Sequence, residues 1–351
     1  MTAMDDSFIP RTPTLAHETA GTLERLRVTH REALSLEHLV DAGVDRLPLP
    51  GSGGTLERWR ILSEVAAQDL SLVKLFEGHT DALAIRRELG AADAAPGTRW
   101  GTWCAEPPDA RVTMQALPPD GSGQAPIRLH GTKAWCSGAR SVTHAVVSCW
   151  NTAGEPCLAE VALGQPAVIV TDDGWHAVGM ADSASVDVRF DGAGARQIGR
   201  AGDYVRRPGF WQGGAGIAAC WFGGALGIAR QARGFCGTKP DAHRLAHLGA
   251  IDAALSAAAA VLRESAAWID AHPRDEARQL ALRVRLVVEE AAHALIAHAC
   301  RATGAAPLCR DARFARAVAD LPVFMRQSHA ERDLAALGET VLDAETTPWK
   351  L

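Results

Sequence analysis

The chain has 351 residues, of which 47% are hydrophobic, and a formal net charge of -5 at pH 7. This length exceeds the roughly 100–200 residues of a single domain, so we expect two or three packed units. The lack of a basic excess argues against nucleic acid or an anionic membrane surface as the main partner. No apolar run approaches the roughly 20 residues of a membrane span and the first residues resemble no secretory signal, so we expect a cytoplasmic protein.

The first part of the chain has a helical pattern. Apolar residues recur at three- and four-residue spacing from about Leu15 to Leu89, and a stretch rich in Gly and Pro at 48–54 interrupts them. Thr55 follows this break and is expected to be a helix N-cap. The pattern predicts an α-helical domain over residues 1–98.

The middle of the chain changes to short runs of strand-forming residues separated by Gly, Pro and Asp. These runs are 111–117, 126–131, 133–137, 143–150, 157–163, 167–171 and 185–190. Many short strands at this spacing are typical of an antiparallel sandwich or barrel. We therefore predict a central β domain over residues 99–200.

The helical pattern returns in four long stretches near 212–235, 245–271, 275–303 and 309–338. They are rich in Ala and Leu, which suits helices that pack closely on one another. They predict a C-terminal helical bundle over residues 201–351. The expected fold class is α+β, in the order helices, β domain, helices.

Metal and disulfide chemistry is not favoured. The eight cysteines form no CxxC pair and several lie in apolar stretches, as expected of reduced, buried thiols. His243 and His247 are four residues apart, a spacing that some zinc sites use. No carboxylate lies between them as in a His-Glu-x-x-His pattern, and no third ligand is evident. We expect no metal site.

Three local motifs in this order resemble the acyl-CoA dehydrogenase family and together cover most of the chain. They are AAQDLSLVKLFEGHTDAL at 66–83, TWCAEP at 102–107 with GTKAWCSGA at 131–139, and VGMADSASVDVRFD at 178–191. The resemblance implies an N-terminal helical domain, a central β-barrel and a C-terminal four-helix bundle. It also implies bound FAD and the α,β-dehydrogenation of an acyl thioester or a related substrate.

The same motifs imply flavin contacts. An isoalloxazine ring needs a flat apolar partner and hydrogen-bonding groups along its N5, O2 and O4 edge. By resemblance, Trp135 lies against the ring, Ser137 bonds near N5, and the backbone from Trp103 to Glu106 meets the pyrimidine end. Ala105 stands where the family usually has Thr, so one hydroxyl contact is lost. Taken without the family pattern, Trp135 reads as a core residue of a strand and Ser137 as a turn residue.

Two further positions match the family loosely. Arg233 stands near the place of an Arg that reaches the FAD pyrophosphate of a neighbouring subunit, which implies a homodimer or homotetramer. Gly304 stands in a turn that contacts the adenine half, although a plain helix C-cap explains a Gly there nearly as well. One alternative for His79 is to face a substrate cavity, but a helix-capping or core role is favoured.

The usual catalytic base is missing. A dehydrogenase of this family removes an α-proton with a Glu about eight residues after an Arg-Asp pair. Counting from Asp320 leads instead to Ser328 and His329. His329 is the sharper candidate because imidazole moves protons near neutral pH, and Glu331 could substitute from the same helix face as Ser328. The alternative is that this segment is only a solvated helix face.

Three functions therefore stay open. The first is FAD-dependent dehydrogenation of an acyl thioester with a separate electron acceptor. The second is a flavin monooxygenase of the same fold, which lacks that Glu and takes reduced flavin from a separate reductase. The third is a flavin-binding or flavin-free relative that has lost its chemistry. For the two enzymes, the expected partner is a small-molecule substrate.

Overall fold

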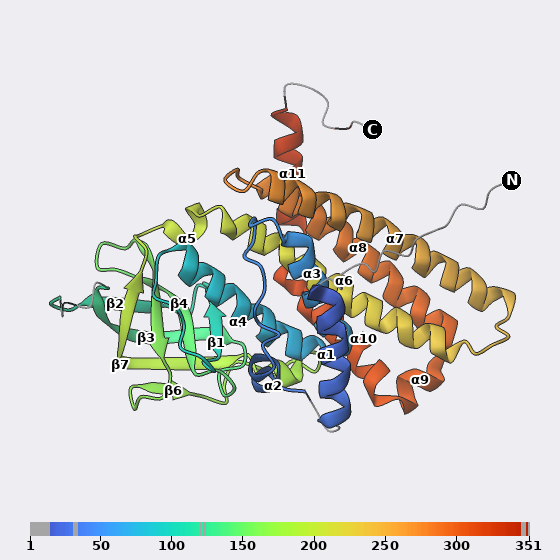
Figure 1. Cartoon of the computed structure of the whole chain (residues 1–351), viewed down its shortest axis with the longest axis horizontal. Helices are drawn as coiled ribbons and strands as arrows, with labels where there is room; N and C mark the ends of the chain where they lie inside the picture. The colour runs from blue at the N-terminus through green and yellow to red at the C-terminus, as the bar shows by residue number, and fades with distance from the viewer. Residues whose placement is uncertain (1–14, 31–33, 120, 122–123, 345–348, 350–351) are drawn as a thin grey trace, which may run out of the picture.

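The structure is a computed structural model that describes residues 15–30, 34–119, 121, 124–344 and 349 (Figure 1). Four helices come first: α1 Leu15–Thr29, α2 Leu36–Asp41, α3 Thr55–Gln68 and α4 Leu70–Glu88. The expected N-cap at Thr55 is wrong, because Thr55 is the first residue of α3 and Gly54 precedes it as the cap. The carboxylate of Asp270, at the end of α7 (Ala242–Ala271), takes over the capping role, accepting from the amides of Gly53 and Thr55 and from the Thr55 hydroxyl at 2.6 Å.

The described residues then form seven strands: β1 Trp100–Trp103, β2 Val112–Ala116, β3 Pro126–Cys136, β4 His144–Trp150, β5 Pro156–Ala162, β6 Val168–Val170 and β7 Val186–Ile198. Hydrogen-bonded pairs lead from β4 through β2, β3, β7 and β5 back to β4, while β1 and β6 add to β4 and β7. Two of the expected runs join into β3, because Gly131 continues the strand with φ 115°. A Cβ at Gly131 would lie 2.2 Å from the carbonyl oxygen of Arg111, so only Gly fits there.

The C-terminal part is helical. Its elements are α5 Asp203–Arg206, α6 Gly209–Phe235, α7, α8 Arg278–Thr303, α9 Ala305–Arg310, α10 Ala312–Phe324 and α11 Glu331–Leu342. A single helix over 309–338 is therefore wrong. The 3-10 turn η2 (Met325–Gln327) ends α10, and Ala330 has a left-handed φ of 46° that no α-helix accommodates.

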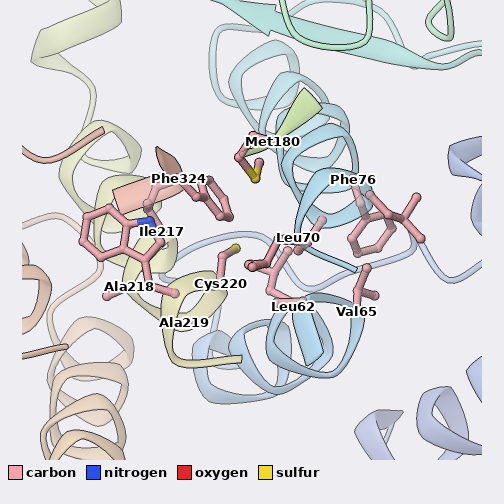
Figure 2. Packing of buried hydrophobic residues seen from close by; sticks show 14 of the residues in the cluster. Leu62, Val65, Leu70, Phe76, Met180, Ile217, Ala218, Ala219, Cys220 and Phe324 are labelled. Carbon is pink, nitrogen blue, oxygen red and sulfur yellow. The ribbon is translucent and has the colours of Figure 1, made fainter. Parts of the chain in front are cut away.

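The helices and the sheet lie side by side, with α4 between them (Figure 1). Helix α4 packs on β1 with one face and on α3 and α6 with the others. One continuous buried cluster joins the layers. Figure 2 shows Met180, from the loop before β7, reaching toward Phe324 of α10, near Leu70 of α4 and Cys220 of α6. The loop that carries Met180 is thus fixed by the bundle as well as by the sheet.

Candidate functional site

Trp135 stands out at the end of β3. Its backbone has a left-handed φ of 57°, and its side chain is 52% exposed although Trp is among the largest apolar residues. The pairing of β3 with β7 skips from Lys133 to Cys136, so Trp135 sits in a bulge outside the ladder. A left-handed conformation costs a residue with a Cβ about 1–2 kcal/mol. Strain of this kind, held on an exposed aromatic ring, is typical of a ligand-binding position.

Ser137 begins a chain of hydroxyl groups beside Trp135. Its Oγ lies 2.8 Å from Oγ of Ser185, which lies 2.9 Å from Oγ of Ser183. The Ser183 hydroxyl donates to the carbonyl oxygen of Met180 at 2.8 Å. Since each hydroxyl has one proton, Ser185 must donate to Ser183 and Ser137 must donate to Ser185. The free lone pairs of Ser137 are therefore acceptors.

The loop that bears these serines, with its 3-10 turn η1 (Ala181–Ser183), is held from two sides. Met180 and Ala184 both have left-handed φ values, 60° and 40°. The Met180 amide donates to Oδ1 of Asp320 in α10 at 2.5 Å. Burial raises the pKa of Asp320, although this hydrogen bond works in the opposite direction. Asp320 thus links the bundle to the hydroxyl chain. In the sequence, Asp320 is only the position from which the place of the catalytic base is counted.

Trp103 holds the backbone of Ser137 in place. The Trp103 side chain is buried, and its Nε1 donates to the carbonyl oxygen of Ser137 at 3.1 Å. Any contact of Trp103 with a flavin would therefore come from its backbone. The next residue, Cys104, is a free thiol whose pKa burial raises to about 11, so it stays protonated near neutral pH. Ala105 follows it, half-buried.

An ion pair between the buried Lys133 and the partly exposed Glu106 fixes the turn after Ala105. The fully buried ammonium group of Lys133 donates to Glu106 at 2.6 Å and to the hydroxyl of Ser148 at 2.6 Å. Partial burial would raise the pKa of Glu106, but hydrogen bonds from Lys133, Ser148 and Trp150 outweigh it and lower that pKa. No sequence pattern predicts this pair, because its members are 27 residues apart.

Helix α4 carries a second charge cluster, in which the buried Glu77 lies near the buried Arg58 of α3. Burial raises the pKa of Glu77 to about 6, with Asp81 also raising it and Lys74 and Arg58 lowering it. Lys74 lies 3.7 Å from the Glu77 carboxylate. Burial also lowers the pKa of Arg58. Glu77 is a group able to exchange a proton near neutral pH that the sequence patterns did not single out.

The three predicted catalytic residues lie in and after the turn that follows η2. Ser328 is buried, and its Oγ accepts from the amide of Ala330 at 3.1 Å, which holds the turn. His329 is exposed and lies 3.4 Å from Asp333. Glu331 is exposed at the start of α11. The shared helix face expected for Ser328 and Glu331 is wrong, because Ser328 has extended backbone and the left-handed residue separates it from α11.

No contact among the described residues joins these three to Trp135 or Ser137. They are connected to the site through α10, which precedes them in the chain. Its Asp320 holds the Met180 loop, and the Met180 carbonyl accepts from Ser183, the last member of the hydroxyl chain. The structure thus brings Trp103, Trp135 and Ser137 together and leaves the C-terminal group separate.

Arg233 and Gly304 lie far from Trp135. They are at the ends of α6 and α8, which Figure 1 shows at the end of the bundle remote from the sheet. Both are exposed, and Gly304 has a left-handed φ of 71° that caps α8. Neither residue can serve a flavin beside Trp135 of the same subunit from this position.

Two of the other histidines named in the sequence, His79 and His247, have internal partners. His79 is a core residue: its Nδ1 accepts from the Trp100 amide at 3.1 Å and its Nε2 lies 3.3 Å from Asp45. His247 meets His298 of α8, with 3.0 Å between their Nδ1 atoms, while His243 is exposed.

A groove of about 530 Å³ lies elsewhere, where β3 and β4 begin. It is lined by residues such as Arg86, Trp100 and His144, and it includes none of the predicted site residues. Because Trp135 and Ser137 are at the opposite end of β3, this groove is separate from the candidate site.

No protein-family model and no curated protein matches the chain. Solved structures do. FMN-bound TdsC, a dibenzothiophene monooxygenase from Paenibacillus sp. A11-2, is 20% identical over 95% of this chain and 99% of its own, with a TM-score of 0.79. KijD3, solved with FMN and dTDP-3-amino-2,3,6-trideoxy-4-keto-3-methyl-D-glucose, is 21% identical over 97% of each chain, with a TM-score of 0.76.

The methanesulfinate monooxygenase MsuC from Pseudomonas fluorescens is 19% identical over 97% of this chain and 99% of its own, with a TM-score of 0.73. At such identities the likeness concerns the fold. The coverage is nearly complete in both directions, so the fold is shared along the whole chain and not in one part of it. The chain has the mixed helix-and-sheet fold of these solved enzymes, which is the acyl-CoA dehydrogenase fold.

Proposed function

We propose that this protein is a flavin-dependent oxidoreductase whose isoalloxazine ring lies against Trp135. The observation that carries the proposal is the half-exposed ring of Trp135 on strained backbone, beside a fixed hydroxyl chain, in a fold whose solved relatives hold FMN. A bound flat ring would cover the exposed face of Trp135 and give the strain a function. FMN in TdsC and KijD3 supports FMN over the FAD that the family resemblance implies.

The proton order of the hydroxyl chain favours reduced flavin as the ligand. Oxidised flavin has an unprotonated N5 that accepts a hydrogen bond, whereas reduced flavin carries a proton on N5 and donates. Ser137 offers an acceptor, because its own proton is committed to Ser185. If Ser137 lies near N5, the site therefore matches the reduced form better.

This preference supports a monooxygenase supplied with reduced flavin by a separate reductase. Such an enzyme places one oxygen atom of O₂ on a small organic substrate and releases the other as water, with two electrons from the flavin. Three of the relatives are consistent with this reaction, since TdsC and MsuC are monooxygenases and KijD3 binds FMN with a sugar nucleotide. His329 is the proposed proton-transfer group, although no described contact joins it to Trp135 or Ser137, and Ser328 holds its turn.

Dehydrogenation of an acyl thioester is the second candidate. It needs a carboxylate opposite the flavin. Glu331 is exposed at the start of a separate helix, which argues against Glu331 as this carboxylate. Glu77 is a buried carboxylate with a pKa of about 6, and it is the observation that keeps dehydrogenation as a candidate. Arg233 and Gly304 would contribute to flavin binding only across a subunit interface.

The first experiment is to purify the full chain, record its absorption spectrum, and identify the flavin it releases or takes up. FMN or FAD binding supports the proposal, and a protein that binds neither refutes it and leaves the non-catalytic relative. An anaerobic titration then separates the reactions: bleaching by an acyl thioester indicates dehydrogenation, whereas substrate turnover only with a reductase and oxygen indicates hydroxylation.

The proton order has its own test. Replacing Ser185 by Ala removes the acceptor for the Ser137 proton, which frees Ser137 to donate. We expect the ratio of Kd values for oxidised and reduced flavin to fall by about tenfold relative to the wild type, as one hydrogen bond is reversed. An unchanged ratio would contradict the assigned proton order.

A further inference from the structure

The groove where β3 and β4 begin lies on the face of the sheet that is turned toward α4. Trp100, which packs against α4, is a register partner of His144, and His144 of Ala162, so the three side chains share this face. Glu160 shares it as well, because it is two residues from Ala162, and so does its register partner Arg196. The segment between α4 and β1 forms a wall. With a volume of about 530 Å³, the groove is large enough for a small organic ligand.

Arg86, near the end of α4, is held in a fixed position at this groove. It is 6% exposed, its Nε donates to Oε2 of Glu160 at 2.8 Å, and its guanidinium carbon lies 4.1 Å from the centre of the Trp100 ring. Its two Nη groups carry four N–H donors, and no residue that the structure describes accepts a hydrogen bond from them. A nearly buried donor without an acceptor is destabilising. An anion that enters the groove would therefore meet a positioned guanidinium that needs acceptors.

The other charges of the lining are mainly positive. Arg128 and Arg196 also line the groove, and Glu160 is the one carboxylate among the described lining residues. Burial, with Arg86 close by, lowers the pKa of His144, so this ring is uncharged near neutral pH. The lining thus has an excess of two positive charges, although the chain as a whole has a net charge of -5. A local positive excess in a groove favours an anionic ligand.

The remaining lining is largely apolar, and burying hydrocarbon against it is favourable. Its apolar members are Ala94, Ala95, Leu117, Pro126, Ile127, Val161, Ala162 and Ala195.

We propose that the groove binds a small organic anion. The carboxylate or phosphate head group of this ligand bonds to the Nη groups of Arg86, and its hydrocarbon body covers the apolar lining. A planar guanidinium matches two oxygens of either head group at once, and Arg86 is already held flat against Trp100.

This ligand site is separate from the flavin site proposed above. Pro126, at the start of β3, lines the groove, and Trp135 lies nine residues further along the same strand. At about 3.3 Å per residue, roughly 30 Å separates the two positions. The inference therefore depends neither on flavin binding nor on the reaction.

Calorimetric titration of the full-length protein with octanoate, octyl phosphate and octanol tests the proposal. The three probes have the same hydrocarbon chain and differ in the head group. We expect at least one of the two anions to bind one to one and roughly tenfold or more tightly than octanol, because only an anion satisfies Arg86. The tighter anion identifies the head group as carboxylate or phosphate. Failure of both anions to bind at millimolar concentration, or octanol binding equally well, would overturn the proposal.

Variants of Arg86 show whether the anion binds in this groove. Arg86→Gln combined with Glu160→Gln removes the guanidinium without leaving an unpaired carboxylate, so the fold should be kept. We expect this double variant to bind the anion roughly tenfold or more weakly and octanol unchanged. Arg86→Lys keeps the charge and the ion pair but loses the planar fork, so it should weaken anion binding by a smaller factor.

Arg87→Gln is the matched control. Arg87 is the next residue of α4, is exposed, pairs with Asp93 and is not part of the lining, so its variant should bind the anion like the wild type. Urea unfolding checks that each variant is folded. An unchanged anion Kd in the folded double variant, or in Arg86→Lys and the double variant alike, would place the anion elsewhere and overturn the proposal.

Discussion

Replacing Trp135 by Gly and by Ala separates backbone strain from cofactor binding. Both changes remove the same ring, which is already 52% exposed, but only Ala keeps the cost of a left-handed φ of 57°. That cost is about 1–2 kcal/mol, and the greater freedom of Gly in the unfolded chain offsets about 0.5–1 kcal/mol of it. Taking the middle of each range, we therefore expect the Gly variant to be more stable than the Ala variant by about 0.75 kcal/mol, the reverse of their usual order.

Flavin binding should respond differently. Stacking of a flat ring on an aromatic side chain contributes about 1–3 kcal/mol, so both variants should bind flavin roughly 10- to 100-fold more weakly. Urea unfolding of the flavin-free protein measures the first effect and a fluorescence titration measures the second. Trp268→Ala, in α7, removes another partly exposed Trp and should leave the flavin Kd unchanged. Equal stability of the Gly and Ala variants, or undiminished flavin affinity, would refute the reasoning.

Three other predictions rest on single groups. Burial raises the pKa of Glu77 to about 6, so the contribution of Glu77 to stability is complete below its unfolded pKa and is lost as the pH rises through 6. Across that window the free energy of unfolding of the wild type, measured with urea, should fall by about 2 kcal/mol relative to Glu77→Gln. Parallel pH profiles of the two proteins would contradict this prediction. Glu106→Gln leaves the fully buried ammonium group of Lys133 without its carboxylate and should lower the free energy of unfolding by about 3 kcal/mol. Lys133→Met leaves only a partly exposed carboxylate and should lower it less. The opposite order of urea unfolding midpoints would contradict this prediction. His329→Ala should lower product formation roughly 100-fold and alter the pH profile without changing the flavin Kd, and unchanged turnover would remove His329 from the mechanism.

Periodicity alone located most of the helices and strands. The runs near 212–235, 245–271 and 275–303 correspond to α6, α7 and α8, and each expected strand has a counterpart. The errors arise where a local rule was overridden. Gly131 was expected to end a strand, but it continues β3 where the backbone of Arg111 passes close by. Ala330 is a strong helix former by composition, and only the bonded turn around Ser328 gives it a left-handed φ.

The site was predictable only in part, for a related reason. Trp135 and Ser137 are in one short motif, so a sequence pattern could name them together. The groups that hold them are distant in sequence: Asp320 reaches the Met180 amide across 140 residues. No spacing rule relates such pairs, because the fold alone brings them together. Buried charges such as Glu77 look like ordinary surface residues of a helix until the packing around them is known.

The cap on α3 has a consequence for how the chain is made. The amides of Gly53 and Thr55 find their acceptor in Asp270, up to 217 residues later. At synthesis rates of about 5–20 residues per second, roughly 10–40 s separate the appearance of α3 from that of its cap. During that interval the first turn of α3 is solvated, and its helix is poorly stabilised on its own. The first turn of α3 therefore gains its cap only after the end of α7 has been synthesised.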